Sequence, residues 1–193
     1  REHLQDIEKT LPQGTTIEPF YDRGELVNRA IRTVSKTLFE AIILVLILLL
    51  LFLGNLRSAL VVAAVLPLSA LSTFLMMRQF GLSANLMSLG GLTIAIGLLV
   101  DAAVVVVENA VSRLDPHAPG AHQPRLHRVF AAAREVAVPV ASGILIICLT
   151  FMPLLTLQGL EGKLFAPVAL TMVFALGVSL LLSLTLVPVL ASM

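Results

Sequence analysis

Charged residues are absent from five long stretches of this chain. The stretches cover residues 41–56, 58–77, 79–100, 136–160 and 164–193. A helix needs about 20 apolar residues to cross the hydrocarbon core of a bilayer. Stretches of this length exclude a soluble enzyme, a nucleic-acid-binding module and a disordered chain. Only 13% of all residues are charged, against about 25% in a soluble domain. We therefore predict an all-α membrane protein.

The transmembrane region is expected to span residues 37–193 and to contain five crossings. We place these helices at about residues 37–53, 58–77, 85–107, 136–157 and 164–190. Prolines inside these ranges are compatible with membrane helices, where neighbouring helices satisfy the freed carbonyl groups. The polar stretch 108–135 carries seven charges and three histidines, and it is predicted to be a loop.

The distribution of arginine and lysine predicts the orientation. One side of the membrane receives Arg57 and four arginines of the 108–135 stretch, whereas the other receives only Arg78 and Lys163. An excess of positive charge marks the cytoplasmic side. The 108–135 loop is therefore expected in the cytoplasm and the N-terminal arm outside.

The first 36 residues differ from the rest. Residues 1–21 combine a short helical pattern with one possible strand, which is too little to bury a core, so we expect the end of an α/β domain. Residues 22–36 have one apolar and one charged face, typical of a helix at the membrane surface. The chain begins at Arg1 and ends at Met193 directly after an apolar stretch. We expect it to be part of a longer protein.

Asp101 is the most informative residue, because it lies about sixteen residues into the third predicted crossing. An ionised aspartate near mid-membrane costs roughly 2.5–3.5 kcal/mol, so such residues usually have a function. Glu108 follows seven residues later, on the same helix face and about 10 Å along the axis. We predict that the two acids relay protons. The alternatives are a structural ion pair for Asp101 and an ordinary position at the helix end for Glu108.

Three sulfur-containing side chains are candidate metal ligands. Cys148 and Met152 stand one helical turn apart, and Met87 lies near the outer side. Thioether and thiolate ligands suit Cu(I) and similar soft ions, although packing alone also explains methionine in an apolar helix. The sequence has no phosphate-binding glycine loop and no nucleophile–base signature. We expect no enzyme activity and no cofactor, so transport would draw its energy from an ion gradient.

Residues 97–109, GLLVDAAVVVVEN, resemble the fourth transmembrane helix of resistance–nodulation–division (RND) exporters. The segment 52–57 resembles the second helix with its cytoplasmic link, and 159–165 resembles the link between helices five and six. The resemblance covers essentially the whole chain. It implies helices two to six of a twelve-helix protein, with residues 1–21 as the end of the first periplasmic porter domain.

The resemblance also implies a mechanism and partners. RND exporters are homotrimeric proton antiporters of the bacterial inner membrane that work with a periplasmic adaptor and an outer-membrane channel, and they do not bind nucleic acid. Asp101 falls on the proton-carrying acid of the family. Drug exporters usually have two adjacent aspartates there, whereas this chain has Asp101 followed by Ala102. The 156–163 link is similar to that of the heavy-metal branch.

Within the heavy-metal branch, the residue at position 95 indicates which metal is exported. Zinc, cobalt and nickel exporters often carry an acid six residues before the aspartate, where this chain has Ala95, as in the copper and silver type. Met87 is available as a ligand, but Leu99 and Val106 stand where that type has two more methionines. We expect proton-driven export of heavy-metal cations, leaning to Cu(I) and Ag(I) over divalent Zn, Co, Ni or Cd. The alternatives are a multidrug exporter and a non-transporting accessory or sensing protein of the same fold.

Overall fold

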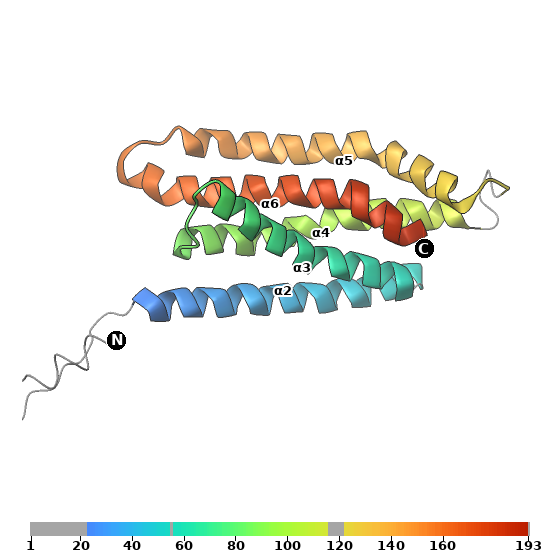
Figure 1. The fold of residues 1–193 in the computed structure, drawn as a ribbon, viewed down its shortest axis with the longest axis horizontal. Helices are drawn as coiled ribbons and strands as arrows, with labels where there is room; N and C mark the ends of the chain where they lie inside the picture. The colour runs from blue at the N-terminus through green and yellow to red at the C-terminus, as the bar shows by residue number, and fades with distance from the viewer. Residues whose placement is uncertain (1–22, 55, 116–121, 193) are drawn as a thin grey trace, which may run out of the picture.

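The computed structural model describes residues 23–54, 56–115 and 122–192, and in this part of the chain it contains helices and no strand. The helices are α2 Arg23–Leu53, α3 Leu56–Gln79, α4 Leu86–Leu114, α5 Arg125–Leu155 and α6 Gly159–Ser192 (Figure 1). Each is long and apolar enough to cross a membrane. The predicted helical membrane fold is therefore confirmed. The expected α/β remnant at 1–21 lies outside the described residues.

The helices extend beyond the charge-free stretches. α2 joins the predicted surface helix and the first crossing into one continuous helix from Arg23. α4 continues to Leu114 and α5 begins at Arg125, so most of the predicted 108–135 loop is helical. This corrects the loop boundaries. Hydropathy identifies only the part of a helix that lies in the hydrocarbon core. The helix itself can continue into water, because its backbone hydrogen bonds do not depend on apolar side chains.

The turn between α3 and α4 has its own local signals. Gly81 has φ +70°, a backbone conformation that a side chain disfavours. Asn85 then caps α4: its side-chain oxygen accepts from the Ser88 N–H at 2.9 Å, and the Ser88 hydroxyl accepts from the Asn85 N–H at 2.9 Å. This reciprocal pair satisfies two amide groups that a helix start leaves unbonded. The beginning of α4 is thereby fixed at Leu86.

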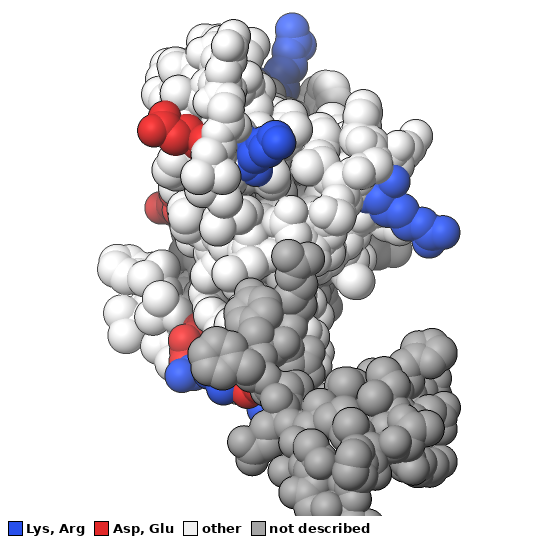
Figure 2. Space-filling model, turned by 90° about the vertical axis from the view of Figure 1, so that its left-hand side faces the viewer, with Lys and Arg blue, Asp and Glu red and all other residues white. Residues whose placement is uncertain are grey.

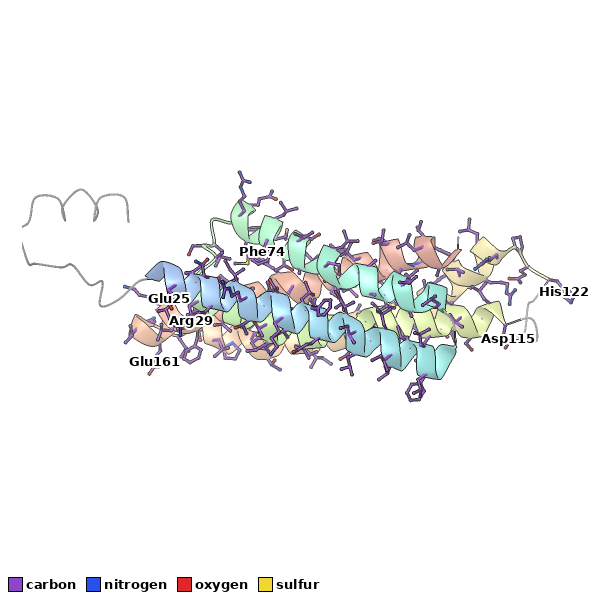
Figure 3. The ribbon with its side chains drawn as sticks, turned by 90° about the horizontal axis from the view of Figure 1, so that it is seen from below. Glu25, Arg29, Phe74, Asp115, His122 and Glu161 are labelled. Carbon is purple, nitrogen blue, oxygen red and sulfur yellow. The ribbon has the colours of Figure 1, made fainter. Side chains whose placement is uncertain are left out.

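α4 is the central helix of the bundle. It packs against α2, α3, α5 and α6, and its most extensive interface is with α6. α4 and α6 run between α5 on one side and α2 on the other (Figure 1). Charges gather at the two ends of the bundle, with Glu25, Arg29 and Glu161 at one end and Asp115 at the other (Figure 3). A change in α4 therefore acts on every other described helix.

Small residues let α4 and α6 approach closely. Ala95 and Ala103 on α4 and Ala175 on α6 are buried in the core. A Cβ atom built on Gly91 would lie 2.8 Å from the backbone oxygen of Val168. Close approach through small residues is a common way of packing helices in membranes. Gly91 thus brings the two backbones into contact near the start of α4.

The outer surfaces of the bundle are strongly apolar. Leu44 and Leu51 on α2 are 64% and 76% exposed, and Val138 on α5 is 74% exposed. At the end that carries the α3–α4 and α5–α6 turns, Lys, Arg, Asp and Glu side chains are scattered among uncharged ones (Figure 2). Exposed apolar surface of this extent requires lipid or further protein around it. These helices therefore belong in a bilayer.

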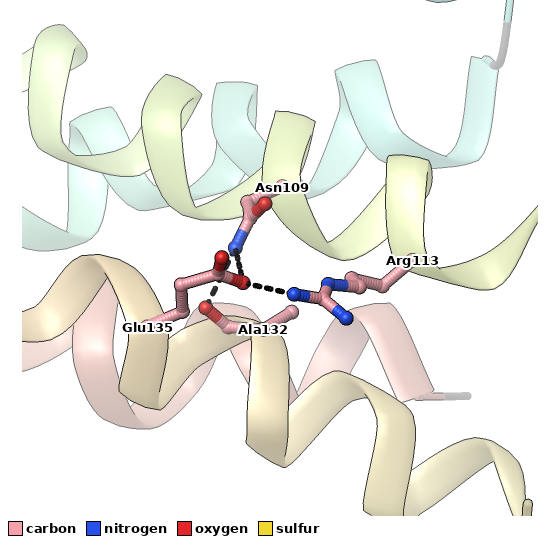
Figure 4. A network of polar contacts seen from close by, with 4 residues as sticks. All are labelled: Asn109, Arg113, Ala132 and Glu135. Carbon is pink, nitrogen blue, oxygen red and sulfur yellow. Dashed lines mark hydrogen bonds and ion pairs between the residues drawn. The ribbon is translucent and has the colours of Figure 1, made fainter. Parts of the chain in front are cut away.

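A polar network joins α4 to α5 near the end where α4 stops (Figure 4). The Asn109 side chain donates to the Ala132 carbonyl at 2.8 Å and to the Glu135 carboxylate at 3.3 Å. Arg113 forms an ion pair with Glu135 at 2.8 Å. The network lies within the stretch that hydropathy alone assigned to a loop. These contacts hold α5 against α4 in this polar stretch.

Two arginines of α5 cap neighbouring helices at the same end. Arg128 donates to the backbone carbonyls of Arg113 and Asp115, at the end of α4. Arg125 donates to the Ala191 carbonyl at 3.3 Å, at the end of α6. The last carbonyls of a helix lack partners within it and carry partial negative charge. These arginines therefore stabilise two helix ends while remaining at the membrane boundary.

Replacing Asn109 by alanine is expected to lower the stability of the 193-residue chain by about 1 kcal/mol, because the bond to the Ala132 carbonyl is lost. Glu135→Gln should have a smaller effect, since its pair with Arg113 is half exposed and screened by water. Thermal unfolding of the purified chain in detergent, followed by circular dichroism, measures both. Arg134→Gln, an exposed neighbour, is the control, and an equal effect of that variant would contradict the assignment.

Candidate functional site

Asp101 lies on α4 beside a groove between α4 and α2. The groove has a volume of about 430 Å³. The α2 side is formed by Ala41, Leu44, Val45 and Leu48, and the α4 side by Gly97, Val100, Val104, Val105 and Asp101 itself. Asp101 is the only charged residue among the described residues of this lining. The carboxyl group therefore lies on an apolar wall, about halfway along α4.

Asp101 and Glu108 belong to one exposed stripe along α4. The exposed positions Gly90, Ile94, Gly97, Asp101, Val105 and Glu108 recur every three or four residues. This spacing places them on one face of a helix. The described helices cover the other face of α4, whose buried residues include Leu92, Ile96 and Leu99. Both acids thus lie on one face of α4, as their seven-residue spacing predicts, while their role in proton transfer stays a prediction.

Asp101 makes no ion pair with any residue of the described ranges. The described ion pairs lie elsewhere, between Arg29 and Glu25 at 2.5 Å, Lys36 and Glu40 at 3.6 Å, and Arg113 and Glu135 at 2.8 Å. The structural alternative, a lysine or arginine from another helix, is thus not realised within the described helices. Glu108 is likewise exposed on α4. The two acids differ in this respect from Glu135, whose charge is balanced locally.

The predicted sulfur ligands lie on two helices. Met87 is in the first turn of α4 and exposed, Cys148 is half-buried on α5, and Met152 is 57% exposed one turn later. All three lie in the halves of their helices nearer the α3–α4 and α5–α6 turns. Among the described residues, no three His, Cys, Asp or Glu side chains gather closely enough to hold a metal ion. The ligand role of the three residues stays a prediction.

Sequence reasoning missed the side chain that ties α6 to the turn before Asp101. The Ser179 hydroxyl donates to the Leu99 carbonyl at 2.9 Å across the α4–α6 interface. A serine within an apolar helix usually bonds its own backbone, as Thr171 and Thr185 do here. Only the packing of α6 on α4 distinguishes Ser179 from these hydroxyls.

The AcrB/AcrD/AcrF family matches residues 1–193 of the chain. This chain belongs to that family. The RND assignment that rests on residues 97–109 is thereby confirmed. The family consists of transporters, and the chain is a multi-pass membrane protein by the length and apolarity of its helices.

Similar proteins are heavy-metal transporters. The chain is 47% identical over 193 residues to the cobalt-zinc-cadmium resistance protein CzcA of Cupriavidus metallidurans, covering 97% of this chain and 18% of CzcA. It is 40% identical to the cation efflux system protein CusA of Escherichia coli K12, covering 98% of this chain and 19% of CusA. The heavy-metal branch is thus confirmed. The chain spans about a fifth of the length of these relatives.

A solved structure supports the same assignment. The chain superimposes on the crystal structure of a heavy metal efflux pump with a TM-score of 0.75 and 38% sequence identity. The match covers 97% of this chain and 18% of that structure. The five helices therefore form the arrangement found in one segment of a larger pump.

Proposed function

We propose that this chain is the proton-responsive segment of a heavy-metal exporter. The observation that carries the proposal is Asp101, the one charged side chain that the described residues place in the groove between α2 and α4. It stands on the helix that contacts all other described helices. The names of the similar proteins, which concern cobalt, zinc, cadmium and cation efflux, support a heavy-metal cation as the substrate.

The proposed mechanism uses the charge of Asp101. In the ionised state the carboxylate needs water or a counter-charge, whereas the protonated carboxyl tolerates an apolar neighbour. Proton binding therefore favours a different packing of the exposed stripe of α4. A proton can shift an equilibrium only as far as it binds the two states differently, so Asp101 must change its surroundings during the cycle. Glu108, on the same stripe, would pass protons between Asp101 and the nearer membrane surface.

The remaining parts of the pump are proposed from the relatives. They are about five times as long as this chain, which leaves ample protein to cover the exposed stripe and to supply a counter-charge to Asp101. We place the complete pump in the bacterial inner membrane as a homotrimer that works with a periplasmic adaptor and an outer-membrane channel. Met87, Cys148 and Met152 are candidate contacts for the metal along its path.

The function can be tested with a chimera in which residues 1–193 replace the matching segment of CzcA. The purified chimera is placed in proteoliposomes with an imposed pH gradient. Cu(I), Ag(I), Zn(II), Co(II), Ni(II), Cd(II) and a cationic dye are then offered in parallel. We expect gradient-dependent movement of a metal and none of the dye. Movement of the dye alone would support the multidrug alternative, and absence of any movement, with wild-type CzcA active, would contradict transport.

A further inference from the structure

A buried hydrogen bond crosses the interface between α4 and α6. Ser179 on α6 is fully buried, and its hydroxyl donates to the Leu99 carbonyl of α4 at 2.9 Å. Leu99 precedes Asp101 by two residues, which is about 3 Å along a helix axis. The bond therefore holds the backbone at the turn that carries Asp101.

We propose that Ser179 is a positioning residue for Asp101, which makes α4 and α6 move as one body when Asp101 gains or loses its proton. This inference rests on the proposed function. Asp101 itself points to the exposed face of α4, so Ser179 acts through the backbone and does not touch the carboxyl group. The consequence is that α6, which bears no charge from Leu164 onward, carries the movement of Asp101 to α3 and α5.

Two contacts at different positions along the helix axes hold α4 and α6 rigidly together. Near the start of α4, Gly91 lies against the Val168 backbone, where a Cβ atom would come within 2.8 Å of the oxygen. About two turns later Ser179 bonds Leu99. One contact point lets two helices pivot or slide, whereas two points separated along the axis resist both. Between them, Met172 and Ala175 of α6 are buried in the same hydrophobic core as Leu92 and Ala95 of α4.

α6 contains a matched control for Ser179. Ser183 lies one turn further along the same face and is also fully buried. Its hydroxyl has no hydrogen-bond partner among the described residues. Ser179→Ala and Ser183→Ala thus remove the same atom from the same helix face at the same burial. They differ in whether a bond to α4 is lost.

The test uses the 193-residue chain in lipid nanodiscs, with Cys148→Ala as background. Spin labels are attached at Ile94→Cys on α4 and Leu181→Cys on α6, both at exposed positions. Electron–electron double resonance gives the distribution of distances between the labels. Asp101→Asn mimics the protonated state. With Ser179 present we expect one distribution, unchanged by Asp101→Asn.

The double variant Ser179→Ala, Asp101→Asn should populate a second distance about fivefold to tenfold more than Asp101→Asn alone, the factor expected for one lost hydrogen bond. Ser183→Ala should behave like the wild type, and Ser179→Thr, which keeps a hydroxyl, should restore the single distribution. If Ser179→Ala and Ser183→Ala respond alike to Asp101→Asn, Ser179 does not position Asp101. The readout needs no transport, so an inactive chimera would count against the proposed function alone.

Discussion

Asp101→Asn is expected to reduce metal export by the CzcA chimera to the level of empty proteoliposomes, while the protein still reaches the membrane. Asparagine has nearly the same shape as aspartate but cannot bind and release a proton, so the gradient no longer biases the packing of α4. Uptake of the transported metal under an imposed pH gradient measures the effect. Glu108→Gln, on the same stripe of α4, should lower the rate without abolishing export.

Glu161→Gln is the matched control for Asp101→Asn. Glu161 is an exposed acid in the first turn of α6, at one end of the bundle (Figure 3), and it does not line the groove beside Asp101. Its neutralisation should leave export within about twofold of the unmodified chimera. If the Asp101→Asn variant still exported metal under the gradient, Asp101 would not be the proton carrier, and Glu108 would be the next candidate.

Gly91→Ala is expected to destabilise the 193-residue chain by about 1–3 kcal/mol, the usual cost of overpacking a closely packed core. The added methyl group would meet the Val168 backbone oxygen at 2.8 Å. The clash is with backbone atoms, which cannot change rotamer as a side chain can. α4 and α6 must therefore move apart. A detergent-denaturation series followed by circular dichroism measures the loss, and it should be accompanied by weaker α4–α6 contact.

Gly90→Ala provides the control one residue away. A Cβ atom on Gly90 meets no atom within 4 Å, and alanine favours helix over glycine by up to about 1 kcal/mol. This variant should therefore be neutral or slightly more stable than the wild type. An equal loss in both variants would show that helix propensity or insertion matters at this site more than the contact with Val168.

The amino-acid sequence by itself determines the membrane class and the number of crossings. Charge-free stretches of 16 to 30 residues have no stable solution outside a bilayer, so their count translates directly into helices. Sequence also places Asp101 and Glu108 on one helix face, because a separation of seven residues is close to two turns. The resemblance of residues 97–109 to an RND helix predicts the family, which the family match over residues 1–193 confirms.

Tertiary structure decides what depends on packing between helices. The ends of α4 and α5 lie beyond the hydropathic boundaries because Asn109, Arg113 and Glu135 hold the two helices together in a polar stretch. Five apolar helices can be packed in several orders, and only their arrangement makes α4 central and leaves the face with Asp101 uncovered. Gly91 and Ser179 look like many other small residues in the sequence. Their significance arises from distances across the α4–α6 interface, which no local pattern encodes.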